Sequence, residues 1–222
     1  MSFFPEWLRE GFLKLIRPLL DVLVRGRVHP NLITTLGFLV TVGAGAAFFH
    51  GRLGWGGFLV LLGGLFDILD GYVARATGLA SVFGSFYDST LDRVSEIVVF
   101  LGLFSIYSGG RPYVGEPWMV YTVALAMAGS LMISYTRARA EALGIDCKVG
   151  LMQRPERVVL IGVAALLGTW WDGLVLTWVL IAMAVLTNLT AFQRIVWVYR
   201  HTRQFPDTPP PAGTPPTSTT LR

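Results

Sequence analysis

Long apolar segments limit what this chain can fold into more than any other feature. Each approaches the ~20 residues that a helix needs to cross a hydrocarbon core of about 30 Å, and Gly, Pro and clustered charges separate one segment from the next. Hydrophobic residues make up 53% of the chain and charged residues only 14%. The sequence therefore predicts an all-α integral membrane protein with six transmembrane helices, at residues 31–49, 54–76, 84–108, 117–141, 156–171 and 173–197.

The regions that flank these helices divide the chain into three parts. Residues 1–28 place apolar and charged side chains on opposite helical faces, which predicts an amphipathic cytoplasmic helix lying in the membrane interface. A soluble helix packed on the rest of the protein is the alternative. Residues 29–200 are expected to form the transmembrane catalytic domain, and residues 201–222, rich in Pro and Thr, a disordered cytoplasmic tail.

Lys and Arg are concentrated on one side of the predicted membrane. An even number of spans places both termini on that side, and the opposite loops carry only Arg52 and Arg111. The positive-inside rule then puts both termini in the cytoplasm and predicts a multi-pass protein of the cell (inner) membrane. Contact with anionic lipid head groups accounts for the net charge of +4, so no nucleic-acid partner is expected.

Four aspartates interrupt the second and third apolar segments. Asp67 and Asp70 are three residues apart, and Asp88 and Asp92 are four apart, so each pair occupies one face of its helix. A short turn, where Gly78 breaks the helical pattern, joins the two helices as antiparallel neighbours. We therefore expect all four carboxylates to meet at a similar depth, near the cytoplasmic face.

Such a cluster requires positive charge, because a buried carboxylate is costly in a membrane and like charges repel. Carboxylate oxygens without His or Cys favour Mg²⁺, Mn²⁺ or Ca²⁺, and four carboxylates can hold two ions. We expect two ions of Mg²⁺ or Mn²⁺. Ion pairs with Arg75 and Arg93 are the alternative. Glu96, one turn beyond Asp92, either supports the metal site or pairs with Arg93.

Small residues lie beside the acids. Gly71 follows Asp70, Ala74 lies one turn further on, and Gly84 lies one turn before Asp88. Small residues permit close helix packing, and beside a metal cluster they also leave room for a ligand near the backbone. A two-metal carboxylate site suits phosphoryl-type transfer, since cations neutralise a pyrophosphate and a carboxylate can accept the proton of an incoming hydroxyl. The sequence thus predicts an enzyme that acts on a phosphorylated lipid.

This pattern of acids and small residues resembles the signature of the CDP-alcohol phosphatidyltransferases. The resemblance covers roughly residues 5–200 and implies a homodimeric, divalent-metal enzyme that transfers a phosphatidyl group from CDP-diacylglycerol to an alcohol and releases CMP. The positions that match the signature are Asp67, Asp70, Gly71, Ala74, Arg75, Gly84, Asp88 and Asp92.

The same resemblance implies roles for individual residues. Asp92 is the implied catalytic proton acceptor as well as a metal ligand. The implied metal ligands are Asp67, Asp70, Asp88 and Asp92. The implied CDP-lipid site consists of Asn31, Thr34, Gly71, Ala74, Arg75, Ser81 and Gly84. The residues leave two alternatives open: Asn31 and Thr34 are also suited to capping the start of a helix, and Arg75 to extending its charge to the membrane surface.

Basic residues in the later segments favour an acceptor that carries its own phosphate. The segments SYTRARAE, RPER and QR are similar to those of the family branch that makes phosphatidylinositol phosphate from inositol 1-phosphate. This similarity implies that Arg137, Arg154 and Arg194 bind the acceptor phosphate, although the branch more often has Lys in the place of Arg137. For Arg137 and Arg154, anchoring at the positive cytoplasmic face is the alternative.

Two other functions stay open at this point. Glycerol 3-phosphate also carries a phosphate, so phosphatidylglycerophosphate synthesis is the alternative within the family. An ion transporter also buries aspartates in its spans. The clustering of the acids at one face, with no acid path across the bilayer, favours the enzyme.

Overall fold

The computed structural model describes residues 6–108, 117–147 and 149–202. Within these ranges the chain forms seven helices and no strand, so the predicted all-α class is confirmed. Each of the six apolar segments forms a helix whose ends lie within a few residues of the predicted ones, and one further helix precedes them. The helices are α1 (Glu6–Arg25), α2 (Pro30–Phe49), α3 (Leu53–Thr77), α4 (Val82–Ser108), α5 (Trp118–Ala142), α6 (Arg154–Gly168) and α7 (Leu174–Thr202).

Local signals set the helix ends around the acidic segments. Pro30 occupies the first position of α2, where its missing N–H costs nothing, and the His29 side chain accepts a hydrogen bond from the Asn31 N–H. His29, rather than Asn31 or Thr34, therefore caps this helix. Gly78 ends α3 with a φ of 69°, a left-handed conformation that glycine adopts without strain. The predicted break at Gly78 is confirmed.

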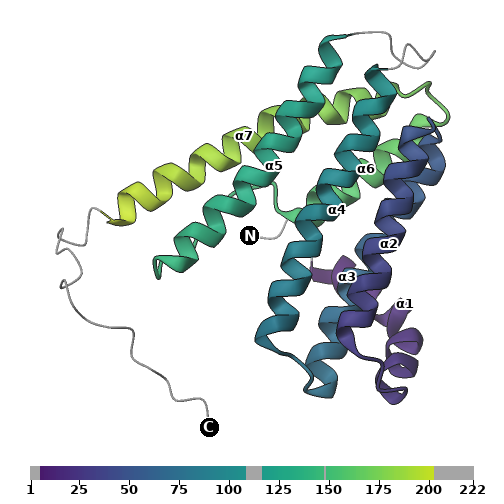
Figure 1. Ribbon diagram of the computed structural model, residues 1–222, viewed down its shortest axis with the longest axis vertical. Coiled ribbons are helices and arrows are strands. Elements are labelled where there is room, and N and C mark those ends of the chain that lie inside the picture. Colours follow the sequence, from purple (N-terminus) through teal and green to yellow (C-terminus); the bar gives the residue numbers. More distant parts are fainter. Residues whose placement is uncertain (1–5, 109–116, 148, 203–222) are drawn as a thin grey trace.

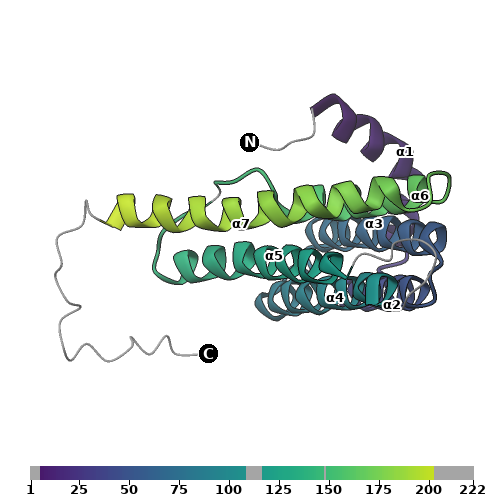
Figure 2. The same cartoon turned by 90° about the horizontal axis from the view of Figure 1, so that it is seen from above.

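The helices pack as two connected groups. Helix α2 packs against both α3 and α4, α6 packs against α3 and α7, and α5 packs against α7 and α4. In Figure 1, α2, α3 and α4 run alongside one another while α5 and α7 lean away from them as a second pair. Figure 2 shows from above that α7 runs beside α5. Helix α1 contacts α3 near the end where α3 leads into α4.

Four of the described helices are long and apolar enough to cross a membrane, namely α2, α3, α5 and α7. Helix α4 has charged residues in its first half, and α6 has only 15 residues. Many large apolar side chains on the bundle surface are exposed, among them Leu39, Phe58 and Trp178. This combination is that of a membrane protein, whose outer surface faces lipid.

Helix α1 has an apolar face that is only partly covered. Ile16 and Leu20 are buried against Leu69 and Val73 of α3. In contrast, Leu15 is 77% exposed. The helix therefore packs on the domain with one part of its apolar face and leaves another part open.

Glycines allow α2 and α4 to approach closely. A Cβ built on Gly102 of α4 would lie 2.4 Å from the carbonyl oxygen of Gly45 on α2 and 2.9 Å from the Cβ of Phe48. Because backbone atoms cannot give way locally, any side chain at Gly102 would push the two helices apart.

We predict that Gly102→Ala destabilises the protein by about 1–3 kcal/mol through this overpacking. The matched control is Gly43→Ala in α2, because a Cβ there meets only a Leu59 methyl group at an ordinary 3.7 Å. Thermal unfolding of both variants in the same detergent is the measurement. An equal midpoint for the two variants would contradict the assigned packing.

Candidate active site

Three aspartates converge where α3 leads into α4. One carboxylate oxygen each from Asp67, Asp70 and Asp88 lies within 4.8 Å of the others. Asp70 is only 5% exposed, while Asp67 and Asp88 are partly buried. The turn at residues 78–81 reverses the chain, so the end of α3 and the start of α4 meet at one level. The predicted convergence is confirmed for these three acids.

The arrangement of the two acidic helices differs from the sequence expectation in one respect. We expected α3 and α4 to be antiparallel neighbours, but each packs closely on α2, and they are not among the closely packed helix pairs of the described chain. Helix α2 thus forms the common wall of the site. The acids meet because the short turn holds the two helix ends together.

The fourth aspartate belongs to an ion-pair network. Asp92 Oδ1 accepts from Arg154 Nη2 at 2.7 Å, and Arg154 Nη1 donates to Asp67 Oδ2. Arg93 Nη2 lies 3.7 Å from Asp92. Arg154 therefore links an acid of α3 to an acid of α4 from a third helix, α6. It shares with Arg93 the role of ion-pair partner that we considered for Arg75 and Arg93.

Helix α2 orients one of the acids directly. The Thr34 hydroxyl donates to Asp70 Oδ2 at 2.7 Å, and this contact is buried. Thr34 was expected in the CDP-lipid site, and it does line the adjacent pocket, but it also fixes a carboxylate. A partner of this kind sets the direction of a metal-ligating oxygen.

A pocket of about 210 Å³ opens beside the acids. It lies between the start of α2, the end of α3 and the start of α4, and Asp70 and Asp88 belong to its lining. Every residue expected in the CDP-lipid site lines this pocket: Asn31, Thr34, Gly71, Ala74, Arg75, Ser81 and Gly84. The structure thus brings that set together at one place.

Small residues keep this pocket open. A Cβ on Gly84 would lie 3.0 Å from Ser81 Oγ and 3.2 Å from Asn31 Oδ1, and so would narrow the pocket wall. The Ser81 hydroxyl already accepts the Gly84 N–H at 3.0 Å and thereby caps α4. The guanidinium of Arg75 lies over Gly71, where a Cβ would come within 3.4 Å of Nη1. Arg75 thus stands at the pocket rather than in the ion-pair network.

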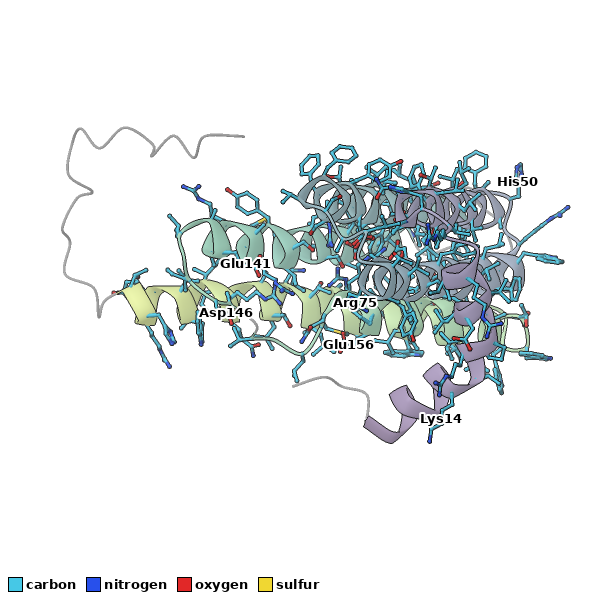
Figure 3. All side chains as sticks on the ribbon, turned by 90° about the horizontal axis from the view of Figure 1, so that it is seen from below. Lys14, His50, Arg75, Glu141, Asp146 and Glu156 are labelled. Carbon is cyan, nitrogen blue, oxygen red and sulfur yellow. The ribbon has the colours of Figure 1, made fainter. Side chains whose placement is uncertain are left out.

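The three arginines expected at the acceptor phosphate have different surroundings. Arg154 lies among the acids. Arg194 on α7 is buried and donates to the backbone carbonyls of Val149 and Ile133, at 2.9 Å and 2.5 Å. Arg137 on α5 is 43% exposed in its side chain and pairs with Glu141 at 2.8 Å. In Figure 3, Glu141 lies beside α5 and α7, to one side of Arg75.

These arginines lie in one region without sharing a described contact. Arg137 and Arg157 are electrostatic neighbours of Arg194. Arg157 is in turn one helical turn from Arg154 on α6. Basic side chains of α5, α6 and α7 therefore lie near one another, and Arg154 is the one that contacts the carboxylates.

Sequence reasoning missed Arg157 and its partner. Glu96 Oε1 accepts from Arg157 Nε at 2.7 Å, and Arg93 Nη1 lies 3.7 Å from Glu96 Oε2. Glu96 therefore pairs with Arg157 first and with Arg93 second. The helical spacing contained a signal, because Glu96 repeats Asp92 and Arg157 repeats Arg154 one turn further along.

The donor set of the cluster fits a divalent cation. Three carboxylates close together repel one another, and Arg154 bonds directly only to Asp67 and Asp92. Hard oxygen donors without His or Cys match Mg²⁺, Mn²⁺ or Ca²⁺. A metal with a pocket of 210 Å³ beside it suits a ligand that carries phosphate groups.

The sequence matches the family model described as CDP-alcohol phosphatidyltransferase over residues 27–190. Among curated proteins it is 37% identical to the archaetidylinositol phosphate synthase of Methanothermobacter thermautotrophicus, over 88% of this chain and 96% of that protein. It is 38% identical to the phosphatidylinositol phosphate synthase of Mycobacteroides abscessus, over 84% of each chain.

Solved structures of the Mycobacterium tuberculosis phosphatidylinositol phosphate synthase are also similar. The structure with CDP-DAG bound superposes with a TM-score of 0.74 at 30% sequence identity, and covers 84% of this chain and 94% of that one. A second, in complex with manganese and citrate, has a TM-score of 0.73 at 31% identity, and covers 82% of this chain and 88% of that one.

We predict that Thr34→Val weakens divalent-cation binding about 10- to 100-fold, because Asp70 loses the hydroxyl that orients it. Titration of the purified protein with Mn²⁺, followed by electron paramagnetic resonance, measures this affinity. The control is Thr77→Val in α3, which removes a hydroxyl bonded only to the Val73 carbonyl among its described contacts. Unchanged Mn²⁺ affinity in Thr34→Val would remove Thr34 from the metal site.

Proposed function

The chain belongs to the CDP-alcohol phosphatidyltransferase family, and on that premise we propose that it makes phosphatidylinositol phosphate. It transfers the phosphatidyl group of CDP-diacylglycerol to inositol 1-phosphate and releases CMP. One observation carries the proposal: the pocket lined by the small signature residues shares Asp70 and Asp88 with the carboxylate cluster. A nucleotide-lipid pyrophosphate held in that pocket would lie against the metal ligands.

The donor follows from the pocket and from the solved relative. The M. tuberculosis enzyme binds CDP-DAG, and it shares the fold at 30% identity. In this chain Asn31 and Ser81 supply polar groups to the pocket wall, and Arg75 supplies a positive charge. Gly71 and Gly84 allow the ligand to approach the backbone.

The acceptor follows from the arginines. Relatives from an archaeon and a bacterium are both named for products that contain inositol phosphate. A phosphorylated acceptor needs several hydrogen-bond donors, and a guanidinium binds phosphate through two parallel bonds. Arg154 lies at the acids, and Arg137 is an electrostatic neighbour of Arg194, so we assign the acceptor phosphate to Arg137, Arg154 and Arg194. The arginines favour an acceptor that carries a phosphate, and the names of the relatives favour inositol 1-phosphate over glycerol 3-phosphate.

The metal ligands are Asp67, Asp70, Asp88 and Asp92, which hold two divalent cations, Mg²⁺ or Mn²⁺. When bound, the cations neutralise the pyrophosphate and stabilise the leaving CMP. Asp92 accepts the proton of the acceptor hydroxyl. Arg154 pairs directly with Asp92, and its second contact, to Asp67, fixes the guanidinium between the acids. An acceptor whose phosphate is bound to Arg154 would therefore have its inositol hydroxyl close to Asp92.

The membrane arrangement extends the four candidate spans to six. Helix α4 has 27 residues, about 40 Å at 1.5 Å per residue, and no acid follows Glu96 in it. Helix α6 is short, but it packs between α3 and α7, and Trp170 and Trp171 follow it as interfacial anchors. Helix α1 lies in the cytoplasmic interface with Leu15 and Val22 in lipid.

This arrangement places both termini and the active site on the cytoplasmic side of the cell (inner) membrane, as the distribution of Lys and Arg favours. The enzyme acts as a homodimer, which is the assembly that the family resemblance implies. Residues 29–200 form the catalytic unit between the interfacial helix and the C-terminal tail. Most of that tail lies outside the described residues.

The function is tested by supplying the purified protein with CDP-diacylglycerol, Mg²⁺ and one acceptor at a time. We expect CMP release with inositol 1-phosphate and little or none with glycerol 3-phosphate, inositol or serine. Release with glycerol 3-phosphate alone would assign the alternative activity. No release with any acceptor, in protein that binds CDP-diacylglycerol, would overturn the proposed acceptor class.

Removal of the base is a second test. We predict that Asp92→Asn lowers kcat about 10²- to 10⁴-fold, because the amide cannot accept the hydroxyl proton. Mass spectrometry or CMP release at saturating metal and substrates gives kcat. Near wild-type turnover in this variant would mean that another group is the base.

Arg194 provides a third test. We predict that Arg194→Gln raises the acceptor KM about 10- to 100-fold, since a charge-assisted bond to phosphate is lost, while the KM for CDP-diacylglycerol is unchanged. Arg139→Gln, an exposed charge in the last turn of α5, is the matched control. If the acceptor KM moves equally in both variants, Arg194 has no specific role in acceptor binding.

A further inference from the structure

Two helices that supply reacting groups do not pack on each other. Helix α4, which has Asp92, packs on α2 and α5, and α6, which has Arg154, packs on α3 and α7. The pair α4 and α6 is not among the closely packed pairs of the described helices. Besides the packing of each helix on its own neighbours, long side chains that reach from one helix to the other act directly on their relative position.

Two ion pairs connect these helices among the described residues. The first joins Asp92 and Arg154, and the second joins Glu96 and Arg157. Arg157 Nε donates to Glu96 Oε1 at 2.7 Å, and Arg157 Nη1 donates to the Met152 carbonyl at 2.9 Å. The Arg157 side chain is 2% exposed and that of Glu96 is 10% exposed. The bridge is thus buried, and one end of it is also tied to the segment that precedes α6.

The two bridges are stacked along the helices. Glu96 follows Asp92 by four residues, and Arg157 follows Arg154 by three, so each pair of residues shares one helical face. A shift of α6 relative to α4 that lengthens the contact between Glu96 and Arg157 therefore also moves the Arg154 guanidinium away from Asp92. Geometry couples the buried pair to the reacting groups.

Apolar packing between α4 and α6 is incomplete beside the two bridges. A cavity of about 40 Å³ lies beside the two bridges, lined by Asp92, Glu96, Arg154 and Arg157 together with residues of α2 and α3. In this part of the bundle the charged side chains, rather than apolar ones, make the direct link between α4 and α6. A buried ion pair is also a poor source of stability, because desolvation of both charges cancels much of their attraction. Its specific contribution is a defined distance and direction.

We propose that Glu96 and Arg157 are positioning residues for the transfer reaction. They hold α6 at a fixed place against α4, so that the Arg154 guanidinium meets Asp67 and Asp92 and presents its remaining donor to the acceptor. This inference rests on the proposed function. The CDP-lipid pocket is lined by no residue of α6, so loss of the pair affects the acceptor side of the site and spares the donor side.

The test compares Glu96→Gln with the double variant Glu96→Met/Arg157→Met. We expect both to lower kcat about 10- to 100-fold, the loss that misplacement of a group by about 1 Å can cause, and to raise the acceptor KM. The KM for CDP-diacylglycerol stays within about twofold of wild type. The double variant removes both charges at similar volume, so it keeps or raises the thermal midpoint, whereas Glu96→Gln lowers it.

A purely structural role would give a different result. In that case the double Met variant, being stably folded, would regain wild-type turnover, and this outcome would overturn the inference. A parallel rise in the KM for CDP-diacylglycerol would also overturn it. Tyr107→Phe is the matched control, because it removes a hydrogen bond from the same helix to Thr177 of α7, four turns from Asp92. It is expected to keep wild-type kinetics.

A spectroscopic measurement separates this inference from the proposed function. Spin labels at Val94→Cys and Val163→Cys, both partly exposed positions on α4 and α6, report the distance between the helices in a Cys147→Ala background. We expect Glu96→Gln and the double Met variant to broaden or shift this distance, and Tyr107→Phe to leave it unchanged. If wild-type protein releases no CMP with any acceptor, the proposed function fails, while these distances still decide whether the pair positions α6.

Discussion

Carboxylates inside an apolar helix bundle must be matched by positive charge, and the site is organised around this requirement. Asp67, Asp70 and Asp88 lie within one small volume, and Asp92 lies one turn away. Arg154 satisfies two of the four acids, Thr34 donates to a third, and the donor set leaves a place suited to divalent cations. Without these partners the cluster would repel itself and the helix ends would separate.

Helix α2 holds the two acidic helices together and forms one wall of the pocket beside the carboxylates. It packs on both acidic helices, aided by the close approach of Gly45 and Gly102, and its N-terminal part reaches Asp70 through Thr34. The turn at residues 78–81 then closes the far side, with Ser81 capping α4. The pocket beside the carboxylates is thus built by three helix ends, while α6 reaches the acids from another direction. The pocket proposed for the donor and the arginines proposed for the acceptor are structurally separate but meet at the carboxylates.

Local patterns in the sequence were sufficient for the parts of this site that depend on nearby residues. The spacing of the aspartates and the break at Gly78 predicted the meeting of α3 with α4, and the small residues predicted an open wall. Contacts between distant segments were not predictable in the same way. No spacing rule tells that Arg154 approaches Asp67 across 87 residues, or that Glu96 meets Arg157 rather than Arg93 alone. The aspartates of α3 and α4 do converge as predicted, but the prediction that the two helices pack side by side was wrong, since each packs on α2 instead.

The position of Arg154 on α6 has a consequence for biosynthesis. The acids of α3 and α4 enter the membrane when the ribosome has not yet made Arg154 or Arg157, which come more than sixty residues later. The nascent chain therefore carries these carboxylates with Arg93 as their nearby counter-ion, and without Arg154 and Arg157, for the time needed to synthesise α5 and the start of α6. Their place at the helix ends, next to a short exposed turn, lets water solvate them in that interval. Assembly of the active site is thus completed by the second half of the chain, because Arg154 and Arg157 pair with acids that were synthesised earlier.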